Sequence, residues 1–168
     1  TGRHEDARVQ RDSARAFSTL SVSDDVKTEI IVQNALPSVL SSATSLDIAC
    51  QRYSTLTLCN LCSGEHKAKI VEDGGVRPLI FLARFPDTEI QGYGSLAMAG
   101  LALGGQGNNK HKVVEEGAVR PLVDLLRFPE RDVQLSSSIA INSLALGQEQ
   151  LCKTAVMTAH GLEPLIAL

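Results

Sequence analysis

Residues 71–80 read VEDGGVRPLI, and residues 114–123 read VEEGAVRPLV, a return after 43 positions. Across the longer windows 71–87 and 114–130, 11 of 17 positions are identical. An internal repeat of this period is typical of a solenoid, in which each unit buries its apolar side chains against its neighbours in the chain. The repeat therefore predicts a protein that presents an extended surface to other molecules.

The composition is that of a globular domain rather than a disordered chain. Of the 168 residues, 43% are hydrophobic and 21% are charged, and the formal net charge is −3. This balance argues against a dedicated nucleic-acid binder, which normally carries a clustered basic excess. The longest apolar stretches, such as residues 96–103, fall short of the ~20 residues that a membrane-spanning helix needs. We therefore expect no nucleic-acid partner and at most an indirect association with membranes.

The four cysteines show no regular spacing that would suggest a disulfide framework. They favour a reducing compartment, so we expect a cytoplasmic protein, with the nucleus as the second possibility. The sequence begins at Thr1 without an initiator methionine, and it stops at Leu168 inside a recognisable repeat element. We therefore expect a piece of a longer array whose upstream targeting signal is not visible.

Each repeat contains one long segment with apolar residues at spacings of three and four, the pattern of a buried helix face. Two shorter helical segments precede it, separated by Gly74 or Gly117, which can end one helix and turn sharply into the next. Asp87 and Glu130 precede two of the long segments and suit a helix N-terminus. The predicted buried sets are Ala14, Ala16, Phe17 and Leu20; Thr55, Thr57, Leu58 and Leu61; Ser95, Ala97, Met98 and Leu101; and Ser138, Ala140, Ile141 and Leu144. The sequence thus predicts three helices in each unit of about 42 residues.

The unit resembles the armadillo repeat, through the run GAVRPLVDLL at residues 117–126 and the sequence LCNLC at residues 58–62. The likeness is one of residue types rather than of a rigid motif, so helical repeats of the HEAT type remain an alternative. It implies an all-α fold, a right-handed α-solenoid of stacked three-helix repeats, with about three full repeats and partial repeats at both ends. We expect a single armadillo-repeat domain over residues 1–168. Its expected parts are a third helix at 5–21, full repeats at 22–63, 64–106 and 107–146, and the first two helices of a further repeat at 147–168.

In armadillo proteins the third helices line a concave groove that binds extended peptides or partner helices, and the resemblance implies such a groove here. Residues four apart that face away from the buried sets would form it. The predicted groove positions are Arg11, Arg15 and Thr19; Arg52, Leu56 and Asn60; Gly92, Leu96 and Gly100; and Leu135, Ile139 and Ser143.

The two halves of this predicted groove differ in character. Arg11, Arg15 and Arg52 make the first half basic, which suits an acidic peptide held by charge-assisted hydrogen bonds. The alternative is that these arginines are merely solvated charges on exposed helices. The apolar contacts expected in the second half come from Leu96, Leu135 and Ile139. An apolar strip of this kind is expected to be covered by a partner, such as an amphipathic helix.

The nuclear-import members of the family carry a groove Trp followed four residues later by an Asn that holds the ligand backbone. This chain has no Trp, and Asn60 alone fills the Asn position, with Leu56 at its partner position. We expect Asn60 to hydrogen-bond the backbone of a partner. The groove residues resemble the catenin-like branch rather than the importins, so a nuclear-import adaptor is a minor alternative.

Three glycines fall in one long helical segment, at positions 92, 94 and 100. Each costs ~1 kcal/mol of helix stability relative to Ala, which calls for a compensating reason. Close approach by a partner helix is one such reason. Tight packing between repeats is the other.

The motifs that resemble chemical sites have simpler explanations. Cys59, Cys62 and His66 have metal-like spacing, but a structural zinc site needs a fourth ligand, and Cys50 is the sole nearby candidate. Small buried thiols are the favoured interpretation. The glycine-rich residues 104–110 lack the order of a phosphate-binding loop. With no nucleophile turn or paired carboxylates, we expect no enzyme activity, no cofactor, no metal and no small-molecule substrate.

The sequence therefore predicts a non-catalytic scaffold or adaptor that binds an acidic peptide or amphipathic helix of a partner protein along the groove. The alternative is an obligate structural subunit of a large axonemal, cytoskeletal or membrane-associated assembly. An apolar surface near the C-terminus would fit either function, because further repeats or a partner are expected to cover it. That surface is predicted from Leu162, Leu165, Ile166 and Leu168.

Overall fold

The computed structural model describes residues 2–103, 109–147 and 150–168, and in these residues it contains helices and turns but no strand. None of these helices is both long and apolar enough to cross a bilayer. The helices are α1 (Gly2–Leu20), α2 (Asp24–Val32), α3 (Leu36–Ser42), α4 (Ile48–Cys62), α5 (Lys67–Glu72), α6 (Val76–Ala83), α7 (Thr88–Ala102), α8 (Asn109–Glu115), α9 (Val119–Leu125), α10 (Arg131–Ala145), α11 (Gln150–Thr158) and α12 (Leu162–Ile166).

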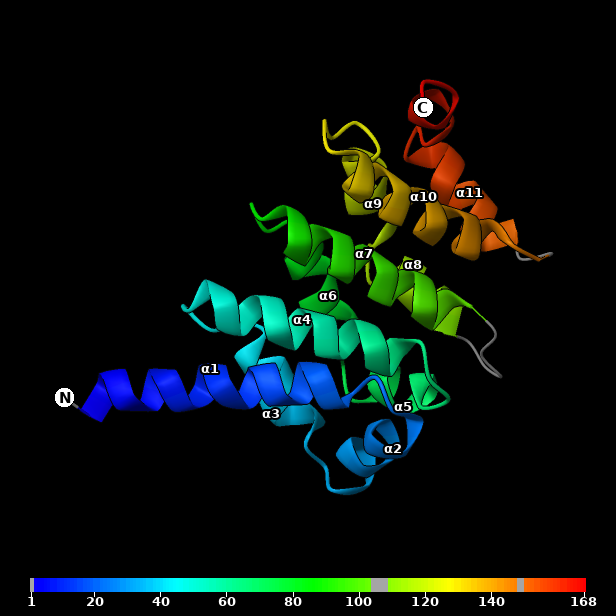
Figure 1. Cartoon of the computed structure of the whole chain (residues 1–168). Coiled ribbons are helices and arrows are strands. Elements are labelled where there is room, and N and C mark those ends of the chain that lie inside the picture. Colours follow the sequence, from blue (N-terminus) through cyan, green and yellow to red (C-terminus); the bar gives the residue numbers. More distant parts are fainter. Residues whose placement is uncertain (1, 104–108, 148–149) are drawn as a thin grey trace.

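Four long helices form a stack that runs the length of the molecule. Figure 1 shows α1, α4, α7 and α10 side by side in this order, with α2 at the α1 end of the stack and α11 at the α10 end. Each long helix packs against the next one in the chain, α1 on α4, α4 on α7 and α7 on α10. The expected all-α solenoid is confirmed, and each of the three predicted full-repeat ranges contains three helices. We call the surface formed by α1, α4, α7 and α10 the long-helix face.

The turns between the two short helices of each unit share one backbone feature. Gly74 (φ 79°) and Gly117 (φ 88°) adopt the left-handed conformation that the sequence suggested for them. Asn34 (φ 53°) and His160 (φ 57°) do the same in the turns after α2 and α11, although neither is a glycine. Four turns of the same kind therefore set the path of the chain.

Three of the long helices, α4, α7 and α10, are each preceded by an acidic residue at the N-cap position. Asp47 accepts a hydrogen bond from the backbone N–H of Cys50 at 3.0 Å, and Asp87 accepts one from Ile90 N–H at 3.1 Å. Glu130 occupies the same position before α10 but its side chain makes no such bond. Two of these three acids therefore cap the helices that they precede.

The buried face of the long helices lies where the apolar spacing predicted it, except in α1 and at Ser138 of α10, which is only partly buried. Leu58, Met98 and Ile141 are fully or almost fully buried. In α1, however, Ala16 is exposed and Leu20 is 55% exposed, so their predicted burial is wrong. Among the described residues α1 packs against one long helix, α4, whereas α4 and α7 each pack against two.

A candidate protein-binding surface on the long helices

The predicted groove positions form three rows across the long-helix face, each taking one residue from each long helix. The first row is Arg11, Arg52, Gly92 and Leu135; the middle row is Arg15, Leu56, Leu96 and Ile139; and the last row is Thr19, Asn60, Gly100 and Ser143. The rows differ in how far their side chains are already engaged within the chain.

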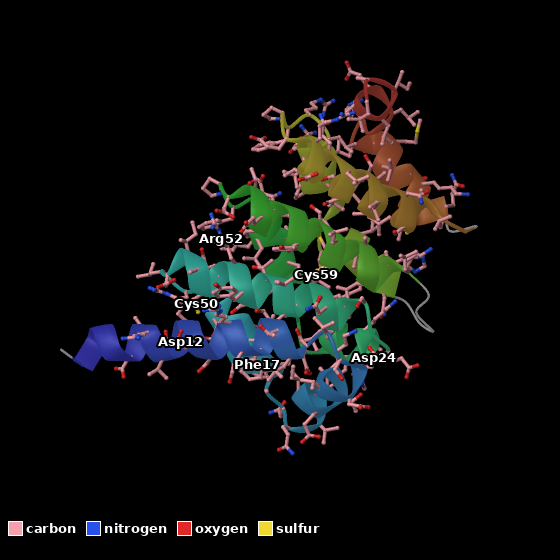
Figure 2. All side chains as sticks on the ribbon, viewed as in Figure 1. Asp12, Phe17, Asp24, Cys50, Arg52 and Cys59 are labelled. Atoms are coloured by element: carbon pink, nitrogen blue, oxygen red, sulfur yellow. The ribbon has the colours of Figure 1, made fainter. Side chains whose placement is uncertain are left out.

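In the first row, two arginines pair with acids of the chain itself. Arg11 forms an ion pair with Asp47, its Nε lying 3.0 Å from Oδ2. Arg52 repeats this arrangement one unit later, with Nη2 at 2.6 Å from Asp87 Oδ2 and Nε at 3.3 Å from Glu89 Oε2. Figure 2 shows Arg52 at the N-terminal end of α4, on the side of α7. Each arginine thus joins one long helix to the N-terminus of the next.

The electrostatics of these pairs follow from their geometry. The hydrogen bond from Arg11 and the one from Cys50 N–H lower the pKa of Asp47. Burial raises the pKa of Asp87, but the hydrogen bonds from Arg52 and Ile90 N–H outweigh it and leave that pKa below its ordinary value. Both carboxylates are therefore held in the charged form that the arginines require.

The third position of the first row lacks an arginine, and a pocket lies there instead. Gly92 on α7 and Glu130 at the start of α10 both line a cavity of about 280 Å³. We call it the Gly92 pocket. Its walls also include Glu89, Tyr93, Leu96 and Asp132. Neither Glu130 nor Asp132 forms an ion pair within the residues that the structure describes.

The middle row is the part of the face that remains open. Arg15 is exposed and has no ion-pair partner within the described part of the chain. Leu56 and Leu96 are half-buried, and Ile139 is 37% exposed. Leu135 of the first row, at 61% exposed, extends this apolar surface on α10. The result is a strip with one free arginine at one end and leucine and isoleucine side chains along the rest.

Two residues of the last row, Asn60 and Ser143, are occupied within the protein, whereas Thr19 is exposed. Asn60 Nδ2 donates to Ser21 Oγ at 3.0 Å and to Ser18 O at 3.4 Å, which ties α4 to the end of α1. The amide group that we expected to bind a partner's backbone therefore spends both of its N–H donors inside the chain. Ser143 is 1% exposed and its hydroxyl donates to Ile139 O at 2.7 Å, so it does not belong to the surface.

Packing explains two of the three glycines in α7. A Cβ at Gly100 would lie 2.6 Å from the carbonyl oxygen of Cys62, and one at Gly94 would lie 3.2 Å from Ala83 N. A Cβ at Gly92 would meet its nearest neighbour, Ser136 Oγ, at 3.7 Å, which is an ordinary contact. Close approach between repeats therefore accounts for Gly94 and Gly100 but leaves Gly92 without a packing reason.

The cysteines behave as buried thiols within α4 and elsewhere. None of the four forms a disulfide in the described residues, and Figure 2 shows Cys50 and Cys59 on α4. Burial raises the pKa of Cys59 to about 11 and also raises that of Cys62. His66 lies 3.0 Å from Thr28 Oγ1. The described residues contain no group of three or more metal-binding side chains, and residues 104–108 of the glycine-rich motif lie outside the described residues.

The acids that pair with the first row are the residues that sequence reasoning missed. Asp47 and Asp87 lie 36 and 35 residues after their arginines, so they are distant in sequence. Their signal was the recurrence of an acidic residue just before α4, α7 and α10, together with an arginine as the fifth residue of α4. That signal could have been read by aligning successive repeats.

No protein-family model matches the chain. Among curated proteins, human Armadillo repeat-containing protein 3 is 32% identical over 91 residues, which span 52% of this chain and 10% of the human protein. The matched part of the chain thus spans about a tenth of that relative's length.

Solved structures extend the likeness to almost the whole chain. An engineered protein superposes with a TM-score of 0.90 at 29% identity, covering 97% of this chain and 40% of its own. A second engineered protein gives a TM-score of 0.89 at 27% identity, with coverage of 96% and 66%. A designed armadillo repeat protein in complex with the peptide (KR)4 gives 0.87 at 24% identity, with coverage of 94% and 66%. The chain has the fold of an armadillo-repeat solenoid.

Proposed function

We propose that this protein is a non-catalytic scaffold that binds a segment of a partner protein along the middle row of the long-helix face. The observation that carries the proposal is the contrast between the rows. In the other rows Arg11, Arg52 and Asn60 are occupied by contacts within the chain, whereas Leu56, Leu96 and Ile139 leave an apolar strip partly exposed on three successive helices. The existence of a designed armadillo repeat protein in complex with a peptide supports a ligand of this kind.

The spacing of the strip constrains the partner. Packed helices lie about 8–10 Å apart, so successive middle-row side chains should be separated by a similar distance. An extended segment covers that distance in about three residues, whereas a helix needs about six. The partner should therefore carry apolar side chains every third residue if it is extended, or every sixth to seventh if it is an amphipathic helix.

The structure changes how an acidic partner would be held. Arg11 and Arg52 already bind carboxylates, so an acidic group would have to displace Asp47 or Asp87 to reach them. Arg15 is the one of the three expected arginines whose guanidinium has no ion-pair partner among the described residues. An acidic residue of the partner would therefore bind at Arg15, at the α1 end of the strip.

A peptide library displayed on phage tests this proposal. We would select binders on the wild-type protein and measure each on a Leu96→Arg, Ile139→Arg double variant, with Val32→Arg, Met157→Arg as the matched control. Val32 and Met157 are exposed apolar residues away from the long-helix face. We expect the peptides to lose binding to the first variant and to keep it with the control. Peptides that bind both variants equally would refute the middle row as the site.

An obligate structural subunit is the second candidate, because apolar side chains are also exposed at the last helix. Ile166 is 84% exposed, and Leu162 and Leu168 are each about half exposed. Obligate interfaces expose large apolar areas when isolated. Sedimentation of the purified chain separates the two functions: an adaptor stays monomeric as its concentration rises, whereas a subunit isolated from its assembly self-associates.

A further inference from the structure

In the first row, an arginine of one long helix forms an ion pair with the acid that precedes the next long helix. This ion pair occurs twice, and the third position of the row lacks the arginine. The fifth residue of α4 is Arg52, which binds Asp87, the residue just before α7. Arg11 binds Asp47, the residue just before α4, in the same way. The fifth residue of α7 is Gly92, and the residue just before α10 is Glu130. At this third position the carboxylate is present and the guanidinium is absent.

The missing side chain leaves a space of the right kind. The Gly92 pocket has a volume of about 280 Å³, and three acidic residues line it, Glu89, Glu130 and Asp132. Glu89 is already paired with Arg52, whereas Glu130 and Asp132 form no ion pair among the described residues. Tyr93 and Leu96 supply aromatic and apolar walls. Arg131, although adjacent to Glu130 in the chain, is not among the residues that line it. Two acids of the pocket, Glu130 and Asp132, therefore remain without a cation among the described residues, beside an apolar wall.

The glycine itself supports a role for this space. Packing against Cys62 requires a glycine at position 100, but nothing within 3.7 Å requires one at position 92. A glycine inside a helix costs ~1 kcal/mol relative to Ala. Since a side chain at this position would occupy the pocket, the glycine keeps it open.

We propose that the Gly92 pocket receives the guanidinium of an arginine supplied by the partner segment. The guanidinium would complete the first row by pairing with Glu130, as Arg52 pairs with Asp87, and its planar face can stack on Tyr93. Two internal examples of the same pair, at Asp47 and Asp87, show which group this carboxylate position takes. The inference rests on the proposed function, because Leu96 belongs to both the pocket wall and the middle row.

Two small-molecule probes distinguish specific binding of a guanidinium group from nonspecific binding. N-acetyl-arginine N-methylamide carries the guanidinium, and the corresponding citrulline derivative is a neutral molecule of nearly the same shape. Each is titrated into the 15N-labelled protein while backbone amide shifts are recorded. We expect the arginine probe to shift the amides of Gly92, Tyr93 and Val133, and the citrulline probe to bind about tenfold more weakly, because it loses the charge-assisted hydrogen bonds.

Three variants locate the response. Gly92→Arg should abolish it, since the chain then supplies its own guanidinium to Glu130. Glu130→Gln should weaken binding of the arginine probe by about tenfold. This second variant keeps the test informative if the Gly92→Arg protein does not fold. Glu115→Gln removes an exposed acid on α8 and should leave the response unchanged.

The inference is overturned if citrulline binds as well as arginine, if Gly92→Arg or Glu130→Gln leaves the response intact, or if Glu115→Gln weakens it equally. These failures differ from a failure of the proposed function. If phage peptides depend on Leu96 and Ile139 but the arginine probe causes no amide shifts, the proposed scaffold function holds and the proposal for the Gly92 pocket fails. If the arginine probe binds but no peptide depends on the middle row, the pocket is a cation site and the partner-segment proposal falls.

Discussion

Asp87 binds two groups from different repeats at once: it accepts a hydrogen bond from Ile90 N–H at the start of its own helix and from Arg52 Nη2 on the preceding long helix. A single carboxylate thus caps α7 and joins it to α4. Asp47 does the same for α4 and α1 through Cys50 N–H and Arg11. Polar contacts, together with apolar packing, therefore determine how successive long helices align with one another.

Low pH should weaken the contact between Asp87 and Arg52 that joins α7 to α4. The pKa of Asp87 is lowered in the folded protein, so its stabilising contribution is complete above the unfolded value of about 4 and is lost as the pH falls through the folded value. Asn can still cap the helix but cannot form the ion pair. We expect Asp87→Asn to lower the free energy of unfolding by about 1 kcal/mol at pH 7, and by much less at pH 3.

Urea denaturation at the two pH values measures this difference. Asp25→Asn is the control, because Asp25 is an exposed acid without an ion pair in the described part of the chain. It should show no comparable loss at pH 7. An Asp87→Asn deficit that is equally large at both pH values would mean that the charge of Asp87 is not what stabilises the joint.

The glycines of α7 provide a second test within one helix. Gly92→Ala should raise the free energy of unfolding by about 1 kcal/mol, because the added Cβ meets only Ser136 Oγ at 3.7 Å. Gly100→Ala should lower it by about 2 kcal/mol, because its Cβ would lie 2.6 Å from Cys62 O. Denaturant titration of both variants gives the signs directly. Equal effects would contradict the distinction between an open and a packed glycine.

Asn60 should act on the structure of the protein rather than on its ligand. Removing its bonds to Ser21 and Ser18 in Asn60→Ala should cost about 1–2 kcal/mol and speed hydrogen exchange of the α1 amides. The matched control is Asn142→Ala, an exposed residue on α10 whose side chain makes no hydrogen bond among the described residues. Unchanged protection of α1 in Asn60→Ala would restore Asn60 as a candidate for binding a partner's backbone.

The thiols should be nearly inert in the folded protein. Since burial raises the pKa of Cys59 to about 11, its thiolate fraction at pH 8 is about two orders of magnitude below that of a free thiol. Cys50, Cys62 and Cys152 are buried. A chromogenic disulfide reagent should therefore react slowly with native protein and promptly with all four thiols in urea. One fast-reacting thiol in native protein would show that α4 opens more readily than its packing implies.

The fold could be predicted from sequence because the repeat signals are local. Gly74 and Gly117 mark turns, and apolar residues at spacings of three and four mark the buried helix faces, so each feature is visible within one unit. The turn at Asn34 was not predicted because Asn34 adopts the left-handed backbone conformation without being a glycine. The burial of Leu20 was predicted wrongly because burial depends on contacts between units, and among the described residues α1 packs against one long helix, α4.

The surface was harder to predict because its character depends on contacts between repeats. Arg52 looks like a free basic residue until Asp87 is placed beside it, and the two are 35 residues apart. Asn60 looks like a ligand-binding amide until the end of α1 is seen against it. The helical period correctly indicates which residues share a helix face, but it cannot indicate which of them already have partners across the interface.

Photo-crosslinking from the middle row tests the central claim most directly. Benzoylphenylalanine would replace Ile139 on the long-helix face, or Val32 on α2 as the control, in protein expressed in cells. Our account predicts a discrete cross-linked partner from position 139 that is absent from position 32 and is lost when Leu96→Arg is added. A partner captured from position 32 but not from 139, or one that persists with Leu96→Arg, would contradict binding along this face.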